Sequence, residues 1–468
     1  MLSATTTNRW NINVGEATID VLSDDALLAI FFLFKEVYSS DPSWWEPLVH
    51  VCRRWRRVIF TSPRRLTLTL LCTSGTPTAS SLDIWPPFPI AVHFVPSGDL
   101  RDILDINLVA ALEHRDRVTE IRFDYLREPN LKLFTFRLML SPFSALTHLS
   151  LGSFDDRTIV LPDRFLGGYA PSLRTLSLER IAFVNLPKLL FSATHLVTLR
   201  LYSVPVLPYI SPVTLATCLA VMPDLRQLEI EFQVRIPLSD QPPLPTRVVL
   251  PSLTSLVFMG ASGYSKELLA QIDAPILQTL SLTFFDRGAR TPQLLRFINC
   301  AESLRPPIQV KVEFDVHMVL LKFMPSDSFE LAIVCDDLAG QISSVALACR
   351  ELLPLLTRVE RLDLYCNNRL PSTKSMNPGH PLELFQPFIN LQNLYVSKKV
   401  WPQVAPALQG LTGESAAEVL PQLRTLFLEE LEKSGQVWES IESFIAARRR
   451  SDQPVAAQQC IASDFADC

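Results

Sequence analysis

The stretch Pro171-Ser172-Leu173-Arg174-Thr175-Leu176-Ser177-Leu178 decides the fold, because its pattern of apolar residues recurs along most of the chain. Leu173, Leu176 and Leu178 fill the pattern apolar-x-x-Leu-x-apolar. The middle leucines of the recurring units are Leu149, Leu176, Leu199, Leu228, Leu256, Leu280, Leu362, Leu394 and Leu426. Alternating apolar residues at the end of each unit predict a strand that turns one side toward a core.

Several of the units share a second feature, a proline at a fixed position. A leucine-rich chain would match the leucine pattern by chance at some positions, but those matches would not also share this proline. It stands two residues before the first apolar position at Pro171, Pro223, Pro251, Pro275 and Pro421. These five of the nine units therefore predict a strand that follows a Pro-fixed turn, with a connecting segment packed behind it. Stacked side by side, such units form an irregular α/β solenoid with a curved parallel sheet. The runs 308–314 and 331–335 are expected to supply further, degenerate units.

Composition places the chain among globular proteins and argues against a nucleic-acid binder. Of the 468 residues, 48% are hydrophobic and 19% are charged, which is typical of a chain that buries a core. The 43 Lys and Arg residues against 48 Asp and Glu residues give a net charge of −5, so there is no overall basic field to hold a phosphate backbone. Leucine is in excess with 75 residues, whereas glycine is scarce at 14.

Cysteine usage and hydropathy favour reduced thiols and no membrane segment. The nine cysteines show no CxxC spacing and are odd in number, which predicts neither a disulfide framework nor a metal site. The longest apolar run, residues 26–34, is about half of the ~20 residues needed to span a bilayer. We therefore expect a protein of the cytoplasm, the nucleus or both, without a membrane partner.

The motifs that usually mark catalytic and cofactor sites are missing from the sequence. It contains no GxGxxG, GxxxxGK[ST], HExxH or GxSxG, and the seven histidines are isolated. We expect no cofactor, no metal and no catalytic residue, and hence a non-enzymatic role. A cysteine-dependent enzyme stays open as the less favoured alternative, because a thiol nucleophile has no motif common to all families.

The segment 19–63 predicts a small helical module ahead of the repeats. Ser23 is placed to cap a helix, and Asp24 and Asp25 follow where the helix dipole favours acidic residues. This helix is apolar almost all round over 27–34, which predicts burial on more than one side. A second helix is predicted over 46–60, with apolar residues at steps of three and four and arginines on its other face.

Residues 19–66 resemble an F-box on two stretches, Leu22-Ser23-Asp24-Asp25-Ala26-Leu27-Leu28-Ala29-Ile30-Phe31 and Val51-Cys52-Arg53-Arg54-Trp55-Arg56. An F-box docks its protein onto the Skp-type adaptor of a cullin ubiquitin ligase. The later units resemble leucine-rich repeats, although most lack the Asn or Cys usual in that family and have Phe154, Ile181, Val204 or Phe285 there. The whole arrangement is similar to fungal F-box proteins with degenerate leucine-rich repeats.

The resemblance implies a substrate-recognition subunit of a Skp-cullin-F-box (SCF) ubiquitin ligase, with the adaptor, a cullin and a protein target as partners. Its docking residues would be Leu22, Leu27, Leu28, Ile30, Phe31, Leu48, Val51, Cys52 and Trp55. The structural alternative is a plain N-terminal cap that seals the repeats. The functional alternative is a scaffold that binds the adaptor but acts outside a ligase.

Target recognition would come from residues between the leucines, on the exposed side of the strands. The candidates are Arg174, Arg200, Arg226, Glu229, Arg361, Asp363, Tyr395 and Arg424. Neither the identity of the target nor its modification state follows from these residues.

These patterns divide the chain into five segments. A flexible leader over 1–17 precedes the F-box-like domain at 18–66 and a Pro-, Thr- and Ser-rich connector at 67–98. The leucine-rich-repeat-like domain is predicted over 99–445, and a disordered tail over 446–468.

Overall fold

The computed structural model describes residues 19–38, 43–76, 78–94, 106–154, 158–205, 210–233, 246–286, 292–304, 306–324, 328–366, 380–409, 419–429, 431 and 434–460. The chain forms two compact units, an N-terminal unit over Met1–Ile121 and a C-terminal unit over Arg122–Cys468. The boundary falls inside strand β3 (Val118–Leu126). The predicted leader over 1–17 lies outside the described residues.

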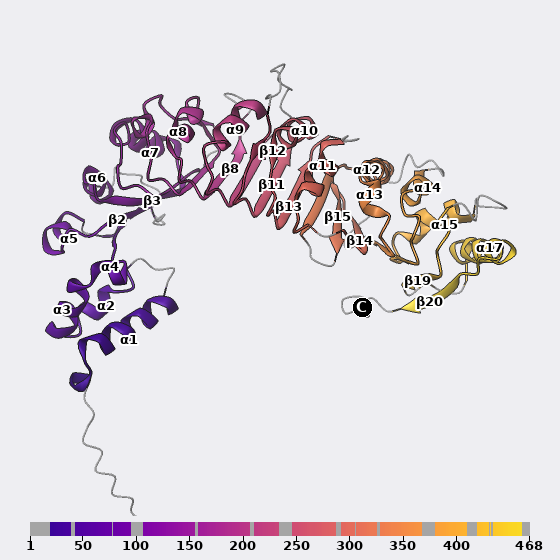
Figure 1. Cartoon of the computed structure of the whole chain (residues 1–468), viewed down its shortest axis with the longest axis horizontal. Coiled ribbons are helices and arrows are strands. Elements are labelled where there is room, and N and C mark those ends of the chain that lie inside the picture. The colour runs from indigo at the N-terminus through magenta and orange to yellow at the C-terminus, as the bar shows by residue number, and fades with distance from the viewer. Residues whose placement is uncertain are drawn as a thin grey trace, which may run out of the picture. The chain divides into compact units, whose positions relative to one another are not determined.

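The N-terminal unit begins with short helices (Figure 1). They are η1 (Ile19–Val21), α1 (Asp24–Val37), α2 (Glu46–Val49), α3 (Arg53–Thr61) and α4 (Pro63–Leu66). The cap of α1 is confirmed, since the Ser23 hydroxyl accepts a hydrogen bond from the Ala26 amide at 3.2 Å. The single helix expected over 46–60 is instead two, because Cys52 adopts an extended conformation and caps α3 with its sulfur.

Trp45 joins these helices to the segment predicted to be a connector. Its fully buried ring lies 5.6 Å from the ring of Trp85 and 5.7 Å from that of Phe88, and its Nε1 donates to the Thr69 carbonyl at 2.9 Å. The segment itself contains β1 (Leu70–Cys72), α5 (Thr78–Ile84) and β2 (Ile90–His93), with β1 and β2 paired in parallel. Helix α6 (Ile106–Glu113) follows. This Pro-rich segment therefore packs as part of the N-terminal unit.

The C-terminal unit is built on a mostly parallel sheet, as the repeats predicted. The middle leucines pair in register on neighbouring strands, for example Leu149 with Leu176 and Leu176 with Leu199. In spatial order the strands are β4 (His148–Ser153), β6 (Thr175–Glu179), β8 (Thr198–Val204), β9 (Gln227–Phe232), β11 (Ser255–Gly260), β13 (Thr279–Phe284), β16 (Phe329–Val334), β15 (Met318–Met324), β14 (Gln309–Phe314), β17 (Arg361–Cys366), β18 (Asn393–Val396), β19 (Thr425–Glu429) and β20 (Ala456–Cys460).

The parallel order breaks at β14, β15 and β16. The two degenerate units were expected to run parallel, but β15 lies between their strands and pairs antiparallel with both. The turn between β14 and β15 is only three residues long, 315–317, which is far too short for the crossover that parallel neighbours need. Strands β14 and β16 nevertheless remain parallel to their outer neighbours β17 and β13.

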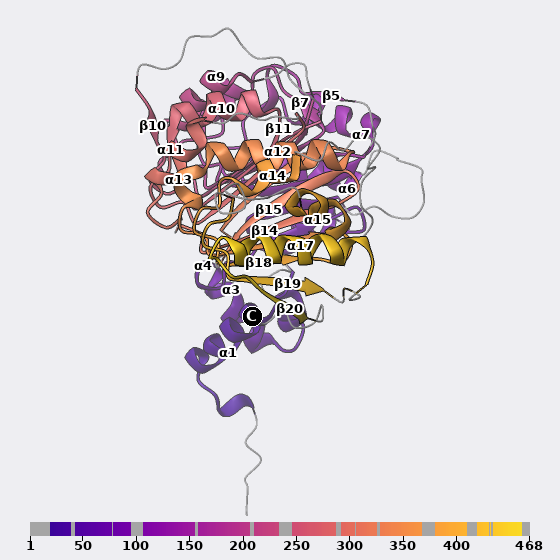
Figure 2. The ribbon, with the colours of Figure 1, turned by 90° about the vertical axis from the view of Figure 1, so that its right-hand side faces the viewer.

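Helices cover one face of this sheet (Figure 1, Figure 2). Leu176, Leu228 and Leu394 are fully buried, while alternate strand residues on the other face are partly exposed. The helices are α7 (Glu128–Leu133), α8 (Leu186–Ser192), α9 (Pro212–Leu219), α10 (Ser262–Gln271), α11 (Pro292–Cys300), α12 (Leu338–Glu351), α13 (Leu353–Leu356), α14 (His380–Phe385), α15 (Trp401–Gln409) and α17 (Gln436–Arg450). Within the described residues, no helix is both long and apolar enough to cross a bilayer.

The prediction of a disordered tail is wrong for residues 446–460. Helix α17 continues to Arg450, and β20 pairs in parallel with β19 through Thr425 and Ala456. Arg448 is fully buried and donates to the Leu420 carbonyl at 3.1 Å, so it ties α17 to the turn before β19. Desolvation lowers the pKa of this guanidinium.

A pair of neighbouring substitutions tests the role of the leucines. Leu280 is fully buried in β13, whereas the preceding Thr279 is exposed. We expect Leu280→Ala to lower the free energy of unfolding by about 2–5 kcal/mol through the lost contacts and the cavity left behind. Thr279→Ala should change it by less than about 0.5 kcal/mol. Urea unfolding followed by circular dichroism measures both, and equal effects would contradict the assignment.

Candidate protein-binding surfaces

One face of α1 packs inside the N-terminal unit. Leu27 and Phe31, one turn apart, are buried, and the Phe31 ring meets the Trp55 ring of α3 edge to face at 5.0 Å. Arg54 of α3 also pairs with Asp24 at 2.8 Å and donates to the Leu22 carbonyl. Helix α3 therefore holds both the inner face and the N-terminus of α1.

The predicted docking residues separate into three groups. Leu27, Phe31 and Leu48 are buried in the unit, so their prediction as docking residues is wrong: their area is already covered by the chain itself. Leu22, Leu28 and Trp55 are partly exposed. Ile30, Val51 and Cys52 are exposed, with fractions of 42% for Ile30 and 58% for Val51.

The outer face of α1 carries apolar residues that the sequence analysis did not name. Phe32, Leu33 and Val37 are 47%, 66% and 77% exposed. Ile30, Leu33 and Val37 follow one another at steps of three and four, so they form a single stripe along the helix. A helical projection that assigned Leu27 and Phe31 to the inside would have placed this stripe on the outside.

A groove accompanies the outer face of α1. It has a volume of about 690 Å³ and is lined by Asp25, Leu28, Ala29, Phe32, Leu33, Arg65 and Leu66. Most of these residues come from α1, and Arg65 and Leu66 come from α4. The lining is therefore apolar along α1, with one acidic and one basic side chain beside it.

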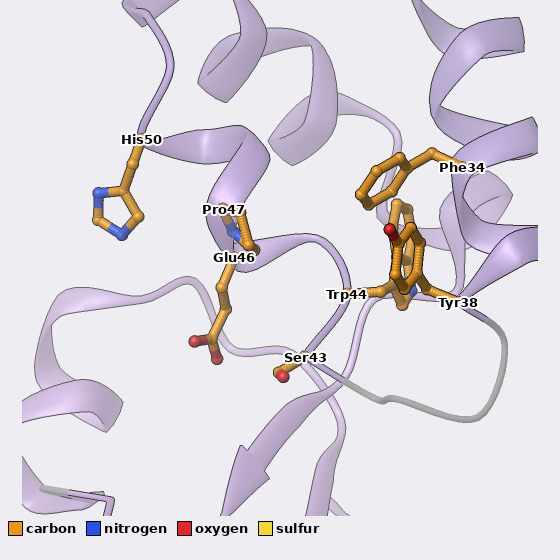
Figure 3. Close-up of a pocket in the computed structure, with 7 residues that line it drawn as sticks. All are labelled: Phe34, Tyr38, Ser43, Trp44, Glu46, Pro47 and His50. Carbon is orange, nitrogen blue, oxygen red and sulfur yellow. The ribbon is translucent and has the colours of Figure 1, made fainter.

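A second hollow of about 520 Å³ lies at the other end of α1 (Figure 3). Phe34, Tyr38 and Trp44 gather on one side of it, with 4.5 Å between the ring centres of Phe34 and Tyr38. Glu46 and His50 project on the other side, from and beside α2. Aromatic faces near a carboxylate attract cations, but the aromatic rings here pack mainly on one another.

The open face of the C-terminal sheet carries polar side chains that bind one another across strands. On β8 and β9, Arg200 Nε donates to a carboxylate oxygen of Glu229 at 3.0 Å, and Arg200 Nη2 donates to the side-chain oxygen of Gln227 at 3.1 Å. The Tyr202 hydroxyl donates to the second oxygen of Glu229. Burial and this hydrogen bond to a carboxylate raise the pKa of Tyr202 to about 12.

A second cluster joins β14, β17 and β18. Asp363 accepts hydrogen bonds from Arg361 at 2.9 Å and from the Gln309 side chain, and the Lys311 ammonium lies 4.4 Å from the centre of the Tyr365 ring. Desolvation raises the pKa of Asp363 against the opposing effect of Arg361. Both carboxylate oxygens of Asp363 are thus hydrogen-bonded within the sheet.

The predicted target-binding residues do not form one surface. Asp363 is 2% exposed and Tyr395 is fully buried, so their prediction as surface recognition residues is wrong. The Tyr365 ring packs against the Tyr395 ring with 4.7 Å between their centres, and Asp363 is held by its hydrogen-bond partners Arg361 and Gln309. Arg200, Glu229 and Arg361 lie in ion pairs. The remaining candidates are exposed: Arg174, Arg226 and Arg424.

Arg174 and Arg226 come together in a pocket that the sequence analysis did not foresee. The pocket has a volume of about 400 Å³ and is also lined by His195, Val197, Asp224 and Ser252. Each of these residues lies in the turn that leads into a strand, so only the stacking of the repeats brings them together.

Three of the buried cysteines within the described residues are unsuited to nucleophilic chemistry. Burial raises the pKa of Cys218 and of Cys349 to about 12, and it also raises the pKa of Cys72. Cys52 and Cys300 are exposed. Over the same residues, no group of three or more His, Cys, Asp or Glu side chains is arranged to hold a metal ion.

Comparisons with known proteins add little to this picture. No family model matches the chain, and no curated protein matches it. Among solved structures, a leucine-rich repeat-containing protein, LegL7 from Legionella pneumophila, is similar at 12% sequence identity over 85% of this chain and 91% of that one. The TM-score is 0.25, which is too low to carry an argument.

Thiol accessibility gives a direct test of the cysteine environments. At pH 8 a thiol with a pKa of about 12 is ionised to only about one part in ten thousand, and the thiolate is the reactive form. We expect iodoacetamide to label Cys52 and Cys300 in the folded protein and to label Cys218 and Cys349 only after unfolding in urea. Peptide mass spectrometry measures each site, and rapid labelling of Cys218 in the folded chain would contradict its burial.

Proposed function

We propose that this protein is a non-catalytic subunit that joins a protein target to the Skp-type adaptor of a cullin ubiquitin ligase. The N-terminal unit binds the adaptor and the repeat unit binds the target. The observation that carries the proposal is the outer stripe of α1, defined as Ile30, Leu33 and Val37.

The stripe supports docking because α1 has two apolar faces and the chain covers only one. Leu27 and Phe31 fill the inner face, while Leu33 and Val37 remain 66% and 77% exposed. Clustered apolar side chains on one exposed helix face mark protein-protein contacts more often than scattered ones do. The adjoining groove of about 690 Å³ offers space for side chains of a partner helix.

The sequence supports the choice of partner, since α1 and α3 lie on the two stretches that resemble an F-box. The structure adds a reason for the arginines of the second stretch. Arg54 binds Asp24, and Arg56 Nε donates to the Val49 carbonyl at 3.0 Å, so both hold the helices together. Their role is therefore structural, which leaves docking to the apolar residues.

The repeat unit supports the target-binding half of the proposal. Its sheet presents a polar face whose side chains change from strand to strand, while the leucines beneath remain the same. A surface of this kind can vary its recognition without altering its core. Holding adaptor and target on one chain raises the effective concentration of the target near the transfer machinery.

Charged substitutions in the stripe test the docking half. We expect Leu33→Asp and Val37→Asp to weaken co-purification with a Skp-type adaptor at least tenfold each, because a charge would have to be desolvated in the contact. Neither residue belongs to the core, so circular dichroism should be unchanged. Binding is measured by pull-down with purified adaptor and by calorimetry.

Phe154→Asp is the matched control, since Phe154 is 58% exposed but lies in the C-terminal unit. It should leave adaptor binding at the wild-type level. Absence of binding by the wild-type chain, or equal binding by the stripe variants, would overturn the proposal. If the adaptor binds but no cullin joins and no target is turned over, the chain is a scaffold outside a ligase.

A further inference from the structure

The pocket lined by Arg174 and Arg226 contains two guanidinium groups and a hydroxyl that can donate hydrogen bonds, and one carboxylate. It is defined by Arg174, His195, Val197, Asp224, Arg226 and Ser252, all within the C-terminal unit. Among the described residues, no side chain forms a hydrogen bond or an ion pair with the guanidinium group of Arg174 or Arg226, or with the Ser252 hydroxyl. The one acid, Asp224, lies 3.5 Å from His195.

The repeat fixes how far apart the two arginines are. The Val197 amide donates to the Arg174 carbonyl at 2.7 Å, and the Arg226 amide donates to the Val197 carbonyl at 2.8 Å. The three residues thus occupy the same position in consecutive turns. Since neighbouring strands are about 4.8 Å apart, the backbones of Arg174 and Arg226 are about 10 Å apart, with Val197 between them.

Val197 explains why a hollow exists there. It is a short side chain between two long ones, and it leaves open space that the arginines can reach from both sides. His195, Asp224 and Ser252 occupy the equivalent position two residues earlier in three consecutive turns, so they form a second tier beside the first. The two tiers enclose the pocket.

The charges point to an anion. The pocket contains two guanidinium groups and only one carboxylate, which lies beside an imidazole, so it has a net positive charge although the whole chain has a net charge of −5. Arginine binds phosphate and carboxylate oxygens through paired N–H donors. The net negative charge of the whole chain disfavours binding of a nucleic-acid backbone, which would need many positively charged contacts.

We propose that this pocket binds an oxyanion, a phosphate or a carboxylate, carried by a partner polypeptide. Arg174 and Arg226 hold the oxyanion from two sides, and Ser252 donates a further hydrogen bond. The inference extends the proposed target-binding role of the repeat unit by naming the chemistry of the contact.

The test uses the full chain labelled with 13C-histidine and inorganic phosphate as the probe, at constant ionic strength against chloride. The His195 imidazole is 68% exposed and lies in the pocket, and its signal is assigned by its loss in His195→Gln. We expect a saturable shift of this signal with millimolar phosphate. The double variant Arg174→Gln, Arg226→Gln should weaken binding at least tenfold.

Arg358→Gln is the control, because Arg358 is exposed in the turn before β17 and lies outside the pocket. It should bind phosphate as the wild type does. No saturable shift, or an equal shift in the double variant, would overturn the inference.

Sodium acetate and O-phosphoserine distinguish the sources of the oxyanion. A shift with phosphate and phosphoserine but not with acetate assigns the pocket to a phosphorylated side chain, whereas equal shifts with acetate assign it to an acidic segment. Adaptor binding depends on α1 in the other unit, so failure here is separable from failure of the proposed function.

Discussion

Backbone hydrogen bonds from turn to turn are the constraint on which the C-terminal unit depends. Arg174 donates to Thr147, Val197 to Arg174, Arg226 to Val197 and Thr254 to Arg226, all between 2.7 and 2.9 Å. This ladder at the start of the strands brings the leucines into register on one face and the variable residues into register on the other. A shift by one residue would exchange the two faces, so the buried leucines maintain the register in turn.

The same constraint explains the surface chemistry of the repeats. Because equivalent positions lie about 4.8 Å apart, residues of opposite charge on neighbouring strands meet and neutralise one another, whereas like charges separated by a short side chain stay unpaired. Arg200 and Glu229 show the first case, and Arg174, Val197 and Arg226 show the second. The turns that carry Arg174 and Arg226 therefore keep hydrogen-bond donors for a partner.

In the N-terminal unit, a different balance leaves a surface open. Helix α1 is apolar nearly all round, yet the short helices beside it provide contacts for only one face. Exposing Leu33 and Val37 to water costs free energy that a partner would recover on binding. The unit is thus stable through Trp45, Phe31 and Trp55 while its outer stripe stays available.

Periodicity in the sequence determined the parallel strands, the buried leucines and the helical N-terminus, because each follows from local spacing of apolar residues. It also determined the Ser23 cap, which needs only neighbouring residues. Only the tertiary structure decided that β15 interrupts the parallel order, that Arg448 is buried, and that Asp363 and Tyr395 are covered. These outcomes depend on residues far apart in the chain, such as Leu420 with Arg448, and so does the meeting of Arg174 with Arg226. Local spacing shows which side of a strand a residue occupies, but not which side chains from other turns lie above it.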